Sequence, residues 1–201
     1  TLARHMSYTE ESAAQCRGFV ICFWQMRTLS QRKFSAEFII AADGCIDIVS
    51  NYADKVIGFA GMSRTDFHHR MDPPTRFLGA RPMPGAFCQL SGLDAAAAMA
   101  HFLPLEAVFA DFDRRLFFSL PFEESKAYFK HFLSQKTRRC RPDRFTSLFD
   151  LLSEEAPPTA EALYHMLELG PRTCQRLFAK HYGITPKMAL SIIRFQRCLQ
   201  Q

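Results

Sequence analysis

One short stretch near the end of the chain carries side chains that suit the recognition of DNA bases. From Pro171 to Gly183 the spacing of apolar residues predicts a helix with one basic, amide-bearing face. An amide presents a donor beside an acceptor, which suits adenine, and a guanidinium fork suits guanine or phosphate. The residues that we expect to contact DNA are Arg172, Thr173, Gln175, Arg176, Lys180 and Lys187. The alternative interpretation is a basic helix surface that is only solvated.

Two short helices and a tight turn must position this face. We interpret residues 159–201 as two helices joined by that turn, followed by a third helix. In this arrangement the second helix enters the major groove of DNA. Six basic and two acidic residues lie from Thr159 onward, although the net charge of the whole chain is only +5. The positive charge is therefore concentrated where a phosphate backbone would lie.

This C-terminal segment resembles the first helix-turn-helix of the AraC/XylS family of transcription regulators over about 26 positions. The matching residues are Arg172-Thr173, Gln175-Arg176-Leu177-Phe178, Gly183, Ile184-Thr185-Pro186-Lys187 and Arg194-Phe195-Gln196. Two positions depart from the family pattern, because Glu168 stands in place of a turn glycine and Gly170 in place of a capping serine. The family has two such units, and the resemblance implies that the second one is missing from a C-terminally truncated chain.

The residues from Gly18 onward show a different periodicity. Short apolar runs separated by turn residues predict strands of an antiparallel barrel or sandwich. These runs are residues 18–26, 36–41, 45–50, 55–59 and 75–83. From Leu93 the apolar spacing becomes helical, in residues 93–102, 104–120 and 122–135. The sequence therefore predicts an α+β protein, with the strands first and the helices after them.

Three motifs in the strand-rich part resemble the sensor domain of a subgroup of the same family. They are Asp43-Gly44-Cys45-Ile46-Asp47-Ile48, Gly79-Ala80-Arg81 and Pro84-Gly85-Ala86-Phe87. Ala41-Ala42 and Pro82-Met83 depart from the subgroup pattern. The resemblance implies a cupin-like antiparallel half-barrel, then helices, then an all-α helix-turn-helix subdomain.

We divide the chain into five segments on this basis. They are a flexible N-terminus (1–17), a sensor barrel (18–91), a helical block for packing or dimerisation (92–153), a proline-containing linker (154–158) and the helix-turn-helix with the start of a connecting helix (159–201). The expected partners are operator DNA, a small-molecule effector and a second copy of the chain.

A barrel of this size can hold one small ligand. The candidate lining residues are Phe23, Trp24, Cys45, Asp47 and Arg81. A structural role remains open for each of them, since Arg81 could simply neutralise Asp47 or Asp43. The expected function is thus sequence-specific DNA binding under the control of a ligand-sensing domain.

Two other functions remain as alternatives. The first is a metal-dependent cupin-type enzyme, but His68 and His69 are adjacent and would point to opposite faces of a strand. The second is a redox sensor acting through Cys45 or Cys88, which requires an exposed thiol of low pKa. Ser63, Asp66 and His68 lie close in sequence, which is weak support for a catalytic triad. We therefore expect no metal, no cofactor and no enzymatic activity.

The seven cysteines are widely spaced, and none forms a CxxC pair. Most have apolar neighbours, where a reduced cysteine behaves as a small apolar residue. Neither an N-terminal apolar core region nor a run of transmembrane length is present. These features predict a reduced, cytoplasmic protein.

Overall fold

The computed structural model describes most of the chain. The described residues are 6–16, 18–29, 36–40, 44–61, 67–71, 74–99 and 101–199, with 36–40, 67–71 and Asp150 described by their backbone alone. Asp43, Ser63 and Asp66 lie outside these residues, as do the side chains of His68 and His69. The pairing of Asp43 with Arg81 and the metal and triad alternatives therefore concern side chains outside the described structure.

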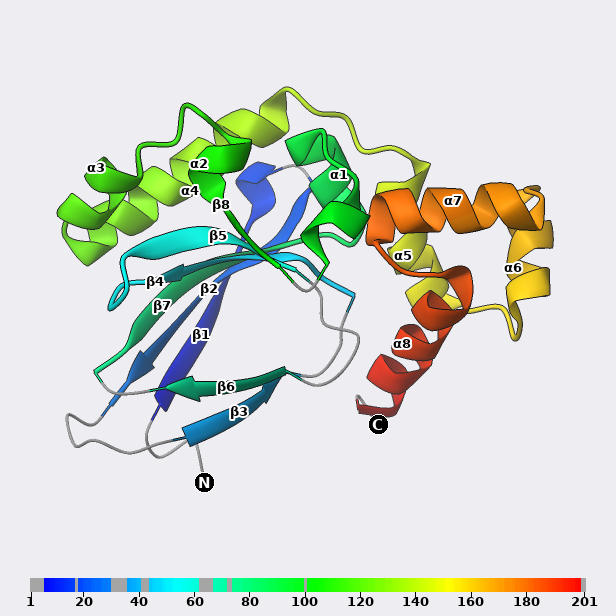
Figure 1. The fold of residues 1–201 in the computed structure, drawn as a ribbon, viewed down its shortest axis with the longest axis horizontal. Helices are drawn as coiled ribbons and strands as arrows, with labels where there is room; N and C mark the ends of the chain where they lie inside the picture. Colours follow the sequence, from blue (N-terminus) through cyan, green and yellow to red (C-terminus); the bar gives the residue numbers. More distant parts are fainter. Residues whose placement is uncertain are drawn as a thin grey trace.

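Two antiparallel sheets form the N-terminal half (Figure 1). The larger sheet has six strands, in the order β1 (Met6–Ser12), β2 (Val20–Thr28), β7 (Arg76–Pro82), β4 (Asp47–Asn51), β5 (Val56–Ala60) and β8 (Phe102–Pro104). The smaller sheet pairs β3 (Ala36–Ile40) with β6 (Phe67–Met71) and lies across from the larger one. All five predicted strands are present, because each combines β-branched or aromatic residues with flanking turn residues.

Helices cover the opposite face of the six-stranded sheet (Figure 1). They are α1 (Ala86–Ser91), α2 (Leu105–Val108), α3 (Arg114–Ser119) and α4 (Phe122–Arg138), with short 3-10 helices at Ala14–Cys16 and Ala95–Ala98. The amphipathic pattern of α4 is confirmed, since Phe129, Phe132 and Leu133 are buried. The Phe129 ring lies 6.0 Å from the Phe23 ring of β2, edge to face. Aromatic packing of this kind joins α4 to the sheet.

Four helices complete the chain: α5 (Arg144–Glu154), α6 (Ala160–Leu167), α7 (Pro171–Tyr182) and α8 (Pro186–Leu199). Their buried residues belong to the same apolar cluster as the covered face of the sheet. Gly44, just before β4, is in tight contact with these helices, since a Cβ at this position would lie 3.0 Å from the Phe149 ring. The main core is therefore continuous between the sheet and these helices, and a smaller apolar cluster of Met6, Cys22, Trp24 and Phe77 lies on the other face of the sheet.

The structure corrects the expected flexible N-terminus. Residues 6–12 form β1, which pairs along its whole length with β2. Glu11 also binds Lys126 and Lys130 of α4, which ties this edge strand to the helical layer. The polar sequence of β1 concealed the strand, because its backbone pairing and a few salt bridges hold it instead of a run of apolar residues.

The helical block also differs from the prediction. Among the described residues from Leu93 to His101, only Ala95–Ala98 are helical, as a short 3-10 helix, and β8 follows and extends the sheet beside β5. Residues 104–120 are divided into α2 and α3, because Asp113 caps a new helix by accepting a hydrogen bond from the Leu116 N–H at 2.9 Å. The strand-rich unit therefore extends to residue 104, beyond the expected boundary at 91.

The predicted linker at 154–158 does not separate α5 from the helices that follow. The Tyr182 hydroxyl of α7 donates a hydrogen bond to the Phe145 carbonyl of α5. The rings of Phe149 and Tyr182 lie 5.2 Å apart. These contacts group α5 with α6–α8, because its apolar face is covered by α7 and α8.

Candidate functional site

A three-residue turn orients α7 relative to α6. Thr159 caps α6, since its hydroxyl accepts a hydrogen bond from the Ala162 N–H at 3.1 Å. Glu168 ends this helix in the left-handed conformation, with φ of 54°. That conformation costs a residue with a Cβ about 1–2 kcal/mol. Gly170 is extended and gives α7 no side-chain cap. Glu168 thus adopts the left-handed conformation in this turn, although glycine would adopt that conformation more readily.

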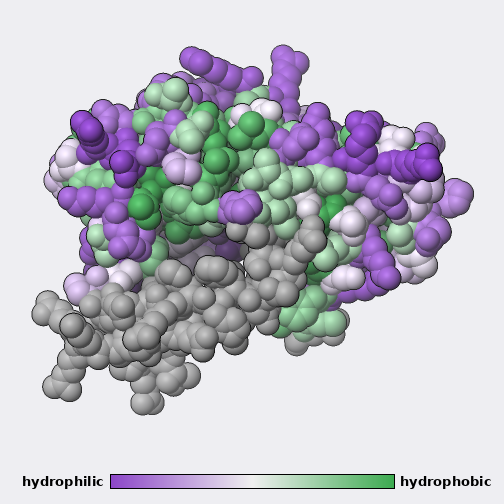
Figure 2. Space-filling model, in the orientation of Figure 1, coloured by the Kyte–Doolittle hydropathy of each residue, from purple (hydrophilic) through white to green (hydrophobic). Residues whose placement is uncertain are grey.

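The exposed face of α7 carries most of the residues predicted to contact DNA. Arg172, Gln175, Arg176 and Lys180 are exposed, whereas Thr173 is half-buried. None of the four exposed side chains forms an ion pair with the other described residues. Figure 2 shows hydrophilic residues gathered over the end of the molecule where α6 and α7 lie in Figure 1. This face is therefore free to contact a ligand.

The opposite face of α7 fixes the helix in place. Cys174, Phe178, His181 and Tyr182 are buried. The His181 ring stacks on the Phe145 ring at 4.3 Å, and its Nδ1 atom lies 3.9 Å from Asp143 Oδ2. Burial lowers the pKa of His181 despite the nearby Asp143 carboxylate. Burial therefore favours the neutral imidazole.

A left-handed glycine connects α7 to α8. Gly183 has φ of 71°, and a Cβ there would lie 2.7 Å from the Met99 sulfur. The Thr185 hydroxyl then accepts a hydrogen bond from the Met188 N–H at 3.2 Å, which caps α8. Lys187 is exposed in the first turn of α8, where it can reach a phosphate group.

Two basic residues of α8 have structural contacts instead. Arg194 donates to the carbonyls of Pro157 and Pro158, the latter at 2.5 Å. Arg197 donates to the carbonyls of Leu152 and Ser153 at the end of α5, where a helix leaves carbonyl groups unpaired. Both charges contribute to the positive excess of the C-terminal segment, but both guanidinium groups donate hydrogen bonds to backbone carbonyls of the protein itself.

The predicted ligand-binding residues are divided between the two faces of the six-stranded sheet. Phe23 faces α4 and is 1% exposed, which places it on the helix-covered face, away from the other predicted residues of the sheet. Trp24 is the next residue of β2 and therefore faces β3 and β6 (Figure 1). Arg81 lies near Asp47, with 3.4 Å between Arg81 Nε and Asp47 Oδ1. Cys45 is half-buried and precedes β4, outside the paired strands.

Three residues that the sequence analysis missed lie on the same face as Trp24. Strand pairing places Tyr8, Glu10 and Cys22 there. The Tyr8 hydroxyl donates to Glu10 Oε1 at 2.5 Å, and burial together with this hydrogen bond raises the pKa of Tyr8. The Tyr8 ring lies 6.2 Å from the Trp24 ring. No local pattern in MSYTEES identifies these residues, because polar side chains lie on both faces of β1 and the common face follows only from strand pairing.

We call Tyr8, Glu10, Cys22, Trp24, Asp47 and Arg81 the polar sheet cluster. Trp24 lies against Gly79 of β7, where a Cβ would be 2.3 Å from the indole. The Trp24 Nε1 atom is buried and has no hydrogen-bond partner in the described structure. An unsatisfied buried donor costs about 1–3 kcal/mol, which a bound acceptor would recover. The Trp24 indole N–H is therefore the group of the cluster that an added hydrogen-bond acceptor would satisfy.

The described residues contain no group of three His, Cys, Asp or Glu side chains that could hold a metal ion. The described residues contain no disulfide bond. Burial raises the pKa of Cys88, which disfavours the thiolate that a redox sensor would need. Within the described ranges, no helix has both the length and the apolar composition needed to cross a membrane.

Comparison with known proteins gives one family match. Residues 11–104 match the family described as a domain of unknown function (DUF6597). The match ends at the last residue of β8 and so covers most of the six-stranded sheet together with β3 and β6. No curated protein and no solved structure matches the chain. The family match supports a unit that ends at residue 104.

Proposed function

We propose that this protein is a sequence-specific, DNA-binding transcription regulator of the AraC/XylS type, with an N-terminal domain that senses a small molecule. The observation that carries the proposal is the exposed face of α7, which follows a tight turn and has no ion-pair partner among the described residues. A DUF6597 domain occupies the N-terminal region of AraC-like proteins in some families, which is consistent with this proposal.

The dimensions of α7 suit the major groove. An α-helix with its side chains is about 10–12 Å wide, and the groove is about 12 Å wide. Arg172, Gln175 and Arg176 have i, i+3 and i+4 spacing, so they lie on one side of the helix. In the proposed complex Gln175 and Arg176 contact base edges, and Lys180 and Lys187 contact phosphates.

The strand-rich part supplies the sensor in this proposal. Its two facing sheets are consistent with a cupin-like half-barrel, and the polar sheet cluster would receive the effector. Trp24 Nε1 would donate to an acceptor on that effector. The protein would act without an enzymatic step and would bind its operator as a homodimer, because paired readers gain affinity and site spacing.

Selection from a random duplex library, followed by fluorescence anisotropy with the enriched sequence, tests the proposal. The Arg176→Ala variant should weaken binding to that sequence by about 5- to 150-fold, as loss of a base contact costs about 1–3 kcal/mol. Arg115→Ala is the matched control, because Arg115 is exposed on α3, far from α7. Failure to enrich any sequence over competitor DNA would refute sequence-specific binding.

A further inference from the structure

A pair of arginines lies on the helix-covered face of the six-stranded sheet, opposite to the polar sheet cluster. Arg27 on β2 and Arg76 on β7 are direct cross-strand partners. Arg27 is four residues after Phe23 in β2, and this even spacing places both side chains on the same face of the sheet. Like charges at opposed positions destabilise an antiparallel pair of strands. Neither guanidinium forms an ion pair with another described residue.

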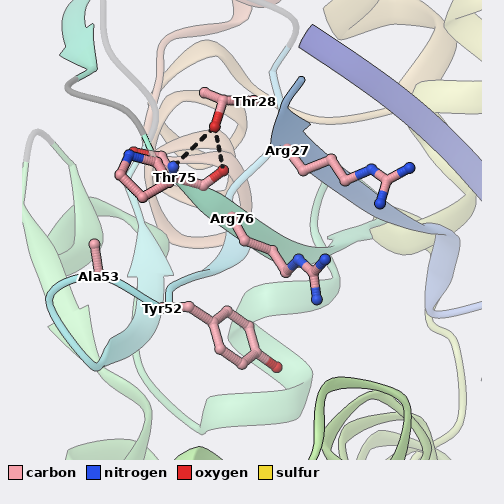
Figure 3. A pocket seen from close by; sticks show the side chains of 7 residues that line it. Arg27, Thr28, Tyr52, Ala53, Thr75 and Arg76 are labelled. Carbon is pink, nitrogen blue, oxygen red and sulfur yellow. Dashed lines mark hydrogen bonds between the residues drawn. The ribbon is translucent and has the colours of Figure 1, made fainter. Parts of the chain in front are cut away.

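The arginine pair lines two hollows at the end of the sheet. One hollow has a volume of about 320 Å³ and the other about 290 Å³. Figure 3 shows the first hollow, with both arginine side chains extending in the same direction from neighbouring strands. The second hollow is also lined by the hydroxyl and amide side chains of Ser7, Thr9 and Gln25. These neutral groups can donate hydrogen bonds to the ligand that the two cations attract.

Other contacts hold the rim of these hollows in place. The Thr28 hydroxyl accepts a hydrogen bond from the Thr75 N–H at 3.0 Å, next to the arginine pair on both strands (Figure 3). The Arg76 guanidinium lies 4.2 Å from the centre of the Phe122 ring. A cation stacked on an aromatic ring keeps its N–H edge available for an anion. The Arg76 fork is therefore oriented before any ligand binds.

We propose that the arginine pair binds the phosphate group of a phosphate monoester. Two guanidinium forks match the oxygen geometry of a phosphate, and its charge removes the repulsion between them. The helix α4 begins beside the second hollow without a side-chain cap, so its first backbone N–H groups add partial positive charge. Glu123 also lines this hollow and opposes the anion. The proposed site is independent of DNA binding.

Isothermal titration calorimetry of the full chain with glycerol 3-phosphate, inorganic phosphate and glycerol tests the site. The two phosphates should bind and glycerol should not. Arg27→Ala should weaken phosphate binding by about ten- to a hundredfold, the loss of one charge-assisted contact. Arg27 is exposed and makes no ion pair in the described structure, so this variant should fold normally. Glu123→Gln should strengthen binding, because it removes the opposing charge.

The control variant is Arg115→Ala, which removes an exposed positive charge from α3 and should leave phosphate binding unchanged. Sedimentation with phosphatidic acid vesicles distinguishes a lipid source of the phosphate monoester from a soluble one. Vesicle binding that depends on Arg27, with no heat from glycerol 3-phosphate, would assign the site to the lipid. Equal phosphate affinities for the wild type, Arg27→Ala and Arg76→Ala would overturn the proposal, as would the absence of binding to every phosphate probe.

Discussion

The hydroxyl group of Tyr182 should contribute substantially to stability, because it joins two helices inside the core. Tyr182 is 1% exposed, and its hydroxyl donates to the Phe145 carbonyl. Tyr182→Phe removes the hydroxyl alone, and the ring still packs against Phe149 and Phe178, at 5.2 and 5.0 Å. The buried carbonyl then lacks this donor.

We expect Tyr182→Phe to lower the free energy of unfolding by about 0.5–1.5 kcal/mol, the net value of one hydrogen bond, because the Phe145 carbonyl lies within α5 and keeps its place in the helical backbone bonding. Domains of about this size lose about 2–4 °C of melting temperature for each kcal/mol. Tyr182→Ala should cost more, about 3–5 kcal/mol, because it also leaves a cavity between Phe149 and Phe178. The two variants together separate the hydrogen bond from the packing of the ring.

Urea denaturation followed by circular dichroism measures both effects. Tyr164→Phe in α6 is the matched control, since no hydrogen bond of its hydroxyl occurs in the described structure, and its effect should stay within about 0.5 kcal/mol. If Tyr182→Phe were as stable as the control, the hydrogen bond to Phe145 would not exist in solution. Two separate unfolding transitions would contradict the continuous core.

Two further predictions concern a buried histidine and a helix cap. Burial lowers the pKa of His181 in the folded state, so below the ordinary value of 6.5 the unfolded chain binds more protons and the free energy of unfolding falls as the pH decreases. His181→Gln should flatten this pH dependence in thermal melts between pH 7.5 and 5.5. An unchanged slope would exclude His181 as the source of the dependence. Thr159→Ala removes the cap of α6 and should cost about 1 kcal/mol in urea denaturation, whereas Thr159→Ser should retain the cap, and equal losses in the two variants would contradict it.

Much of the fold could be predicted from local sequence patterns. The apolar alternation of β2 and the helical spacing of α4 both predicted elements that the structure contains. The polar strand β1 and the three-residue strand β8 could not be predicted in this way, because their pairing depends on neighbours distant in sequence. The grouping of α5 with α7 was also hidden, since it depends on tertiary contacts of Phe145 and Phe149.

The candidate sites could be predicted in part, for a similar reason. The spacing of Arg172, Gln175 and Arg176 on one helix is local, and the structure places them together on an exposed face. The polar sheet cluster combines residues from β1, β2, β4 and β7, so its membership depends on the strand register. A difference of one residue moves a side chain to the other face of a sheet, which is why Trp24 joins the cluster and Phe23 does not.

The continuous core has a consequence for the way the chain is made. During synthesis the strands through β8 are complete at residue 104, but the helix that covers Phe23 ends only at residue 138. Until then α1 covers only part of the apolar face, and the part around Phe23 is exposed to water; such surfaces promote aggregation. The span that matches the domain family therefore contains only part of the cover of its sheet, and a fragment ending at residue 104 would need a chaperone or α4 itself to remain unaggregated.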